Sequence, residues 1–168
     1  MCKKKTTLMR MTLTDVLQSN SSDQVDQSAV EAGNALKTII TEAEIENRVV
    51  NGIHCCAAQL QNCPDNVMAC ILADYGPLED VTINIEHTLL EAYCMENYIK
   101  VIKVDSSKKM KKYLSTLQKN NKYPERSGDY TCMLIKNPKV ADEKAENTLL
   151  KFEKLHHIWG WHLIEFPV

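Results

Sequence analysis

The chain has 168 residues, of which 44% are hydrophobic and 25% are charged, and its formal net charge at pH 7 is -2. This size and composition are typical of one globular domain with a sizeable hydrophobic core. The small net charge excludes a global electrostatic attraction to nucleic acid or to a membrane, so any such partner must be recognised locally.

Cysteine usage indicates a reducing compartment. The chain has seven cysteines, an odd number, and Cys70, Cys94 and Cys132 lie inside apolar runs where cysteine behaves as a small hydrophobic residue. No C-x-x-C pair is present, so a zinc ribbon or a thioredoxin-type site is not expected. No stretch approaches the roughly 18 apolar residues of a membrane span, and the N-terminus lacks a long apolar segment. We therefore expect the protein in the nucleus and cytoplasm, with no membrane contact.

The N-terminal part divides into a polar tail and the first elements of one domain. Residues 1–27 cannot bury enough apolar surface to offset their ordering entropy, so we predict a disordered tail followed by a single domain over residues 28–168. Helical spacing predicts a helix over about residues 29–47. Asn51 is a suitable N-cap for a second, almost uncharged helix over residues 52–61. The unbroken apolar run over residues 67–73 is typical of a central strand covered on both faces.

The segment over residues 79–105 organises the chain, because its helix has more apolar surface than one helical stripe can hold. Asp80 is expected to cap this helix. One row along it consists of Val81, Ile85, Leu89 and Ala92, and the other of Ile83, Leu90 and Cys94, with His87 between them. One row suits the core of the domain. The other must be covered by a further layer or another subunit, because small proteins rarely leave a contiguous apolar patch in water.

The second half of the chain alternates strands and helices. A β-branched run predicts a strand over residues 99–104, and a lysine-rich helix follows over residues 107–118, with Met110, Tyr113, Leu114 and Leu117 on its inner face. We expect further elements at residues 130–135, 140–157 and 161–166, a strand, a helix and a strand. Such alternation favours parallel pairing with helices on both faces. The predicted fold class is therefore α/β, a three-layer α/β/α sandwich around a mixed sheet of four or five strands.

No group of residues predicts catalysis. His156 and His157 with His162 are the nearest approach to a metal cluster, but adjacent histidines on a helix point about 100 degrees apart and chelate poorly. His54 beside Cys55 suggests a Cys-His nucleophile, but helix neighbours face different directions and burial is the better interpretation. The chain has no glycine-rich phosphate loop, no G-x-S-x-G and no paired-carboxylate motif. We predict a protein that is not an enzyme and uses no cofactor or metal.

A group of lysines leaves a second function open. The group consists of Lys108, Lys109, Lys111, Lys112, Lys119 and Lys122. It has enough positive charge for non-specific contact with phosphates, although a solvated helix face explains the same pattern. An RNA- or DNA-binding module that uses the helix over residues 107–118 is therefore the alternative to a protein-binding function.

Four short stretches, in a fixed order along the chain, carry a family resemblance. The longest joins His-Thr-Leu-Leu-Glu-Ala-Tyr-Cys-Met-Glu-Asn (87–97) to Ile-Lys-Val-Ile-Lys-Val (99–104). The others are Gly-Asn-Ala-Leu (33–36), Pro-Asp-Asn-Val (64–67) and Cys-Met-Leu-Ile-Lys-Asn-Pro (132–138). Together they resemble the growth arrest and DNA-damage-inducible (Gadd) family over residues 28–168. The resemblance implies the same α/β/α fold, which is shared with ribosomal proteins that bind kink-turn RNA.

The resemblance also implies a function. Gadd proteins are small non-enzymatic stress-response adaptors that dimerise or oligomerise. They bind an upstream kinase of the stress-activated MAP kinase cascades, a MAP kinase kinase kinase. They also contact proliferating cell nuclear antigen, a cyclin-dependent kinase inhibitor and a mitotic cyclin-kinase complex, and act in DNA repair and demethylation. For this chain the resemblance implies a homodimeric or higher-oligomeric regulator of growth arrest, the cell cycle and apoptosis.

A dimer interface follows from the same resemblance. In the family a leucine of the central helix is the main dimer contact, and an ungapped match places it at Leu89. The second helix contributes to that interface, so the implied contact residues are Leu89, Ile85, Ala92, Tyr93, Ile53, Cys56 and Leu60. The alternative interpretation of this row is an intramolecular core.

The chain departs from the pattern of the Gadd family and also from that of the kink-turn-binding proteins. The acidic loop before the central helix is short here, and a weaker negative field reduces the steering of basic partners. The residues implied for partner binding in and beside this loop are Asp74, Glu79, Asp80 and Glu86. The second departure is in the Gly-x-Asn-Glu-x-x-Lys motif of the kink-turn-binding proteins. It is matched after Gly52 by His54, Cys55 and Ala58, which disfavours kink-turn binding.

Overall fold

The computed structural model describes residues 30–74, 81–121, 128–139, 147 and 163–167. The expected tail over residues 1–27 lies outside the described residues, and so does the expected helix over residues 140–157 apart from residue 147. A helix over residues 30–45 comes first. It is followed by β1 (Val49–Asn51), α2 (Ile53–Asn62), a short 3-10 helix (Pro64–Asn66), β2 (Val67–Ala73), α3 (Val81–Glu96), β3 (Lys100–Val104), α4 (Ser107–Asn121) and β4 (Cys132–Lys136).

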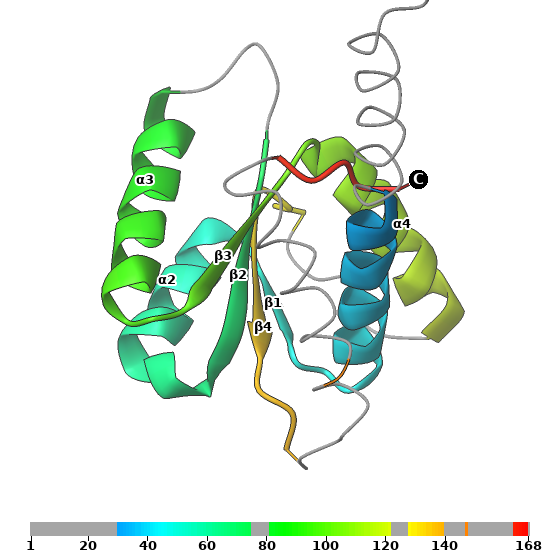
Figure 1. The fold of residues 1–168 in the computed structure, drawn as a ribbon, viewed down its shortest axis with the longest axis horizontal. Coiled ribbons are helices and arrows are strands. Elements are labelled where there is room, and N and C mark those ends of the chain that lie inside the picture. Colours follow the sequence, from blue (N-terminus) through cyan, green and yellow to red (C-terminus); the bar gives the residue numbers. More distant parts are fainter. Residues whose placement is uncertain (1–29, 75–80, 122–127, 140–146, 148–162, 168) are drawn as a thin grey trace, which may run out of the picture.

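The four strands form one mixed sheet in the order β1-β4-β2-β3 (Figure 1). β2 and β3 are parallel, with Ile71 opposite Ile102, as the alternation of strands and helices predicts. β4 lies between β1 and β2 and is antiparallel to both, so the expectation of parallel pairing is wrong for this strand. Apolar periodicity shows which residues form a strand but not the end from which the strand enters the sheet.

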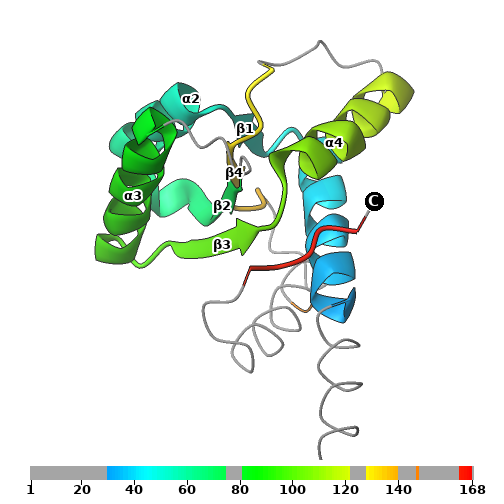
Figure 2. The same ribbon diagram turned by 90° about the horizontal axis from the view of Figure 1, so that it is seen from above.

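Helices cover both faces of the sheet, which confirms the α/β/α sandwich (Figures 1 and 2). On one face, the helix over residues 30–45 and α4 pack on a core that includes Leu36, Ile71, Leu114 and Ile135. On the other face, α2 and α3 cover a second core that includes Cys70, Leu72, Cys132 and Leu134. Side chains alternate between the two cores along β4 and, from Ala69 onward, along β2, because successive residues of a strand point to opposite faces.

The start of α2 differs from the sequence-based expectation. Asn51 is the last residue of β1, a strand too short to show a period, so its assignment as the N-cap is wrong. Gly52 occupies the cap position with a φ of 90°, which glycine adopts without strain, and offers no side-chain acceptor. Asp129 supplies the acceptor from before β4, where its Oδ2 receives a hydrogen bond of 3.1 Å from the Ile53 N–H. Two distant segments therefore define where α2 begins.

The C-terminal segment over residues 163–167 lies along the edge of β3. Ile164 forms a parallel bridge with Val104, and its N–H donates a hydrogen bond of 2.9 Å to the Lys103 carbonyl. A strand is expected at residues 161–166, but of the described residues 163–166 only Ile164 pairs with β3, through this single bridge. Phe166 is fully buried, and its ring meets that of Tyr113 edge to face with centroids 5.5 Å apart. This segment closes the core beneath the helix over residues 30–45.

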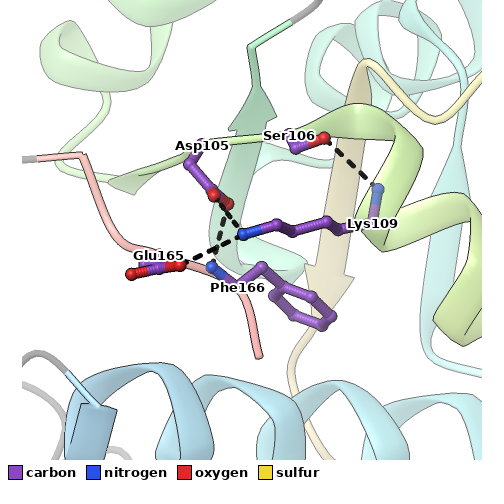
Figure 3. A network of polar contacts seen from close by, with 5 residues as sticks. All are labelled: Asp105, Ser106, Lys109, Glu165 and Phe166. Carbon is purple, nitrogen blue, oxygen red and sulfur yellow. Dashed lines mark hydrogen bonds and ion pairs between the residues drawn. The ribbon is translucent and has the colours of Figure 1, made fainter. Parts of the chain in front are cut away.

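A polar network holds the same segment in place (Figure 3). The Asp105 carboxylate accepts a hydrogen bond of 2.9 Å from the Phe166 N–H and one of 2.6 Å from Lys109 Nζ. Lys109 Nζ also lies 3.4 Å from Glu165 Oε1. The Asp105 contact, reinforced by Glu165, raises the pKa of Lys109. Asp105 therefore links β3, α4 and the C-terminal segment.

Within the described ranges, none of the helices combines the length and the apolar character that crossing a membrane would need.

Candidate interaction surface

α3 separates its two apolar rows between the core and the surface. Of its sixteen residues only Leu90 and Cys94 are buried, and both belong to the second row. The first row points away from the sheet: Val81, Ile85 and Leu89 are 71%, 56% and 65% exposed, and Ala92 is exposed beside them. The structure thus assigns one row to the core and leaves the other uncovered within the described chain, as the two-row pattern predicts. We call Val81, Ile85, Leu89 and Ala92 the outer row.

The residues that the resemblance implies for a dimer interface fall into two groups. Ile85, Leu89 and Ala92 lie on the outer row and are accessible. Ile53, Cys56 and Leu60 are at most 7% exposed and belong to the core between α2 and the sheet, so in this structure their contacts are intramolecular. Tyr93 is half-buried, and its hydroxyl donates a hydrogen bond of 3.2 Å to the Leu60 carbonyl, which ties α3 to α2.

α2 lies beside α3 on the same side of the sheet and adds its own exposed residues (Figures 1 and 2). Cys55, Ala57 and Ala58 are exposed on α2, in a helix with no acidic first turn and no basic last turn. Small side chains allow close approach of a partner. The nearly uncharged sequence of α2 indicated that these residues could contact a partner. Which side of the helix faces the core could be known only from the fold.

The acidic residues expected to bind partners are only partly described. Glu79 and Asp80 lie outside the described residues, and so does the expected capping role of Asp80. Asp74 is half-buried at the end of β2, where its backbone carbonyl accepts a hydrogen bond of 2.9 Å from the Ser107 N–H. Glu86 lines a cleft of about 680 Å³ together with Lys108 and Lys111. Its negative charge therefore shares a cleft with two lysines, and their positive charge reduces the field available to a basic partner.

Asp129 has a structural role at this surface that the sequence did not predict. Besides capping α2, its Oδ1 accepts hydrogen bonds from the Thr131 N–H at 3.0 Å and the Thr131 hydroxyl at 2.7 Å. Burial alone would raise the pKa of this carboxyl, but the hydrogen bonds from Thr131 and Ile53 outweigh it and hold the pKa below its usual range. The Asp-x-Thr spacing is a local signal for the Thr131 contacts. The contact with Ile53 has no local signal.

A smaller cleft of about 360 Å³ lies between α3 and the ends of β2 and β3. Its walls include His87, Glu91 and Lys103, and the last two form an ion pair of 2.8 Å that joins α3 to β3. His87 Nε2 is inaccessible and has no hydrogen-bond partner in the part of the chain that the structure describes. Burial lowers the pKa of His87 and so favours its neutral imidazole.

Four buried thiols meet beneath α2 and α3. They belong to Cys56 of α2, Cys70 of β2, Cys94 of α3 and Cys132 of β4. Hydrogen bonds from the thiols of Cys132 and Cys94 hold the pKa of Cys70 well below its usual range, although burial opposes them. The contact with Cys70 and burial raise the pKa of Cys94, whereas the contact with Cys56, followed by that with Cys70 and by burial, raises the pKa of Cys132. Within the described residues, no group of three or more histidine, cysteine or acidic side chains is arranged to hold a metal ion.

Some lysines of α4, the lysine-rich helix, form contacts within the protein. Lys108, Lys111 and Lys112 are exposed on α4, whereas Lys109 is paired with Asp105 and Glu165. The Lys119 side chain and Lys122 lie outside the described residues. Lys108 and Lys111 share their cleft with the carboxylates of Glu86 and Asp129. Carboxylates therefore offset part of the positive charge along the described part of α4. The histidines at 156, 157 and 162 also lie outside the described residues.

The fold and this surface define a class of protein: a small α/β/α sandwich that presents an apolar helix face. Three curated relatives identify the family more closely. The chain is 33% identical to growth arrest and DNA damage-inducible protein GADD45 alpha of Rattus norvegicus over 119 residues, which covers 67% of this chain and 71% of the relative. It is 30% identical to GADD45 alpha of Mus musculus over 132 residues, with 74% and 79% covered. It is 29% identical to GADD45 gamma of Rattus norvegicus over 129 residues, with 76% and 79% covered.

No model of a protein family matches the chain. The identity to the individual relatives and the share of the chain that they cover show that the chain belongs to the growth arrest and DNA damage-inducible family. The alpha, beta and gamma forms of this family all match it. It is therefore a growth-arrest and DNA-damage stress-response protein.

Proposed function

We propose that this protein is a non-enzymatic stress-response adaptor that self-associates through the outer row of α3 and binds signalling proteins. The observation that carries the proposal is the exposure of Val81, Ile85 and Leu89 along one side of a helix whose opposite side forms the core. Contiguous apolar surface of this kind marks interaction sites in small globular proteins. Family membership supports a role in growth arrest and the response to DNA damage.

The partner that best fits the outer row is a second copy of the chain. Two copies related by a two-fold axis would bring Leu89 of each close to the same row of the other, so that apolar surface meets apolar surface. A helix of sixteen residues is about 24 Å long and about 10 Å wide, so two such faces bury only about 500 Å². A specific interface needs about 1,000 Å² or more, and the exposed Cys55, Ala57 and Ala58 of α2 supply the additional surface.

We further propose that the dimer binds an upstream MAP kinase kinase kinase of the stress-activated cascades. Additional proposed partners are proliferating cell nuclear antigen, a cyclin-dependent kinase and its inhibitor, with the protein acting in the nucleus and cytoplasm. The proposed contact region is the end of the molecule at Asp74 and Glu86, together with Glu79 and Asp80. Because Glu86 shares a cleft with Lys108 and Lys111, we expect weaker electrostatic steering here than an unbalanced acidic loop would give.

Sedimentation tests the dimer. Leu89 is 65% exposed, and burying the side chain of a leucine contributes about 1.5–3 kcal/mol, so its truncation to Ala in both copies removes roughly 2–4 kcal/mol. That loss raises the dissociation constant roughly 30- to 700-fold. Leu89→Glu places two unpaired carboxylates in the interface and should give a folded monomer.

The matched control is Val30→Glu, an equally exposed aliphatic residue (58%) on the helix that covers the other face of the sheet. This variant should sediment like the wild type. A wild-type protein that stays monomeric at high concentration, or a Leu89→Glu variant that dimerises as the wild type does, would refute the proposed interface.

A separate pull-down tests the adaptor function. The reduced wild-type protein is offered purified regulatory segments of stress-activated MAP kinase kinase kinases, and bound kinase is measured with and without Glu86→Lys. We expect capture by the wild type and weaker capture by the variant, because a charge reversal removes attraction to a basic partner. Failure of the wild type to capture any such segment would refute the kinase partner and leave the dimer to be judged by sedimentation.

A further inference from the structure

The two halves of α3 differ in how firmly the rest of the chain holds them. Residues 81–89 form the first half of the helix, and none of them is buried. Residues 90–96 form the second half, which contains both buried residues of the helix, Leu90 and Cys94. These two side chains lie in the core that α2 and α3 cover. The core therefore holds α3 by its second half.

Two polar contacts also fix the second half. The Tyr93 hydroxyl donates a hydrogen bond of 3.2 Å to the Leu60 carbonyl of α2. Glu91 forms an ion pair of 2.8 Å with Lys103 of β3. The second half is thus joined to a helix on one side and to a strand on the other.

The first half of α3 borders two clefts. The smaller has a volume of about 360 Å³ and the larger about 680 Å³, and Ile83 lines both. Ile83 is half-buried and packs against the second core. His87 lines the smaller cleft, and its buried Nε2 has no hydrogen-bond partner among the described residues. Side chains fill such space where a helix fits closely on a sheet, so the first half is loosely packed within one copy.

A helical segment of this length is not stable by itself. Isolated helices shorter than about 12–15 residues are marginal in water, and most helical stability in proteins comes from packing of an apolar face. Along residues 81–89 most of the apolar surface points outward, because Val81, Ile85 and Leu89 are exposed. Ile83 is the one aliphatic residue of this segment that packs on the core. The missing stabilisation must come from whatever covers the outer row.

We propose that a second copy of the chain orders the first half of α3, so that residues 81–89 fray in the monomer and form a stable helix in the dimer. The inference rests on the proposed dimer, in which two copies bring the same apolar row together. Burial of Val81, Ile85 and Leu89 in that interface supplies the packing that the segment lacks within one copy. Self-association through α3 is therefore also a local folding step.

Hydrogen exchange of individual amides tests this inference. In α3 the N–H groups of residues 85–89 donate to carbonyls of the first half, whereas those of residues 94–96 donate to carbonyls of the second half. The Asn97 N–H, which donates a hydrogen bond of 3.1 Å to the Tyr93 carbonyl, also reports on the second half. The full-length reduced protein is exchanged at a series of concentrations that spans dissociation of the dimer. Sedimentation at each concentration gives the dimer fraction, and mass spectrometry of overlapping peptides gives the exchange.

The expected result is a difference between the two halves that depends on concentration. In the dimer both groups of amides should be protected. On dilution to the monomer, residues 85–89 should exchange at least about tenfold faster, while residues 94–97 keep their protection. Leu89→Glu should show fast exchange of residues 85–88 at every concentration. Glutamate and leucine have similar helix propensities, so this substitution does not itself disrupt the helix. The control Val30→Glu should exchange like the wild type.

The outcomes that contradict the inference differ from those that contradict the dimer. Equal protection of residues 85–89 and 94–97 in the monomer would overturn the inference and leave the proposed dimer standing. So would fast exchange of residues 85–89 in a protein that sediments as a dimer. Loss of protection in both groups on dilution would refute the assignment to the first half. A wild type that sediments as a monomer at every concentration would refute the dimer, and the second copy as the ordering partner with it.

Discussion

Removing the carboxylate of Asp129 should destabilise the start of α2 by a predictable amount. This side chain accepts three hydrogen bonds, from the Ile53 N–H at 3.1 Å and from the Thr131 N–H and hydroxyl at 3.0 and 2.7 Å. Loss of an N-cap costs about 1 kcal/mol, and hydrogen bonds to a charged group contribute about 1.5–3 kcal/mol each when no water replaces them. Asp129 is half-buried, so water restores part of the loss.

We therefore expect Asp129→Ala to lower the free energy of unfolding by about 2–3 kcal/mol, and Asp129→Asn, which keeps one acceptor oxygen, by about half of that. Urea denaturation followed by circular dichroism measures both changes through the midpoint at constant slope. Asp65→Ala is the control, because this carboxylate is exposed, and it should stay within about 0.5 kcal/mol of the wild type.

The pH dependence sharpens the test. The pKa of Asp129 is lower in the folded protein than in the unfolded chain, so the unfolded chain binds the proton first as the pH falls. The stability contributed by Asp129 is fully present above a pH of about 4 and is lost as the pH drops through the folded pKa. The difference in the free energy of unfolding between the wild type and Asp129→Ala should therefore become smaller at acidic pH. An Asp129→Ala variant as stable as the wild type at pH 7 would refute this reasoning. A difference in the free energy of unfolding that is the same at pH 3 as at pH 7 would refute it as well.

Three further predictions concern the core and the C-terminal segment. Asn51 is buried without a hydrogen-bond partner for its amide in the described chain, so Asn51→Leu should raise the free energy of unfolding by about 1–2 kcal/mol in urea titration; a clear loss of stability would contradict this. A Cβ on Gly33 would lie 2.6 Å from the Glu165 carbonyl, whereas one on Gly128 would meet nothing within 4 Å. Gly33→Ala should therefore lower the free energy of unfolding by about 1–3 kcal/mol and expose the C-terminal segment to proteolysis. Gly128→Ala is the control and should change neither. The His87 imidazole should titrate by NMR below a pH of about 6.5, and stability should fall as the pH drops through that range, since the unfolded chain takes up the proton first; titration above that value would contradict the burial argument.

Local patterns in the sequence determined the elements and their amphipathic faces. The apolar run at Val67–Ala73 is a central strand, and Met110 and Leu114 lie on the buried side of α4, because period and side-chain type are properties of neighbouring residues. The two rows of α3 were visible in the same way. The sequence pattern and the family resemblance together also indicated the α/β/α sandwich before any coordinates.

Only the tertiary structure decided which surfaces meet. It placed β4 antiparallel between β1 and β2, made a strand of Val49–Asn51, and capped α2 with a carboxylate from 76 residues away. It buried Leu90 and left Leu89 exposed, and it brought four thiols together from separate elements. These outcomes depend on strand register and on packing between segments distant in the chain. A residue's local neighbours carry no information about either, since a shift of one residue in register moves every side chain of a strand to the other face.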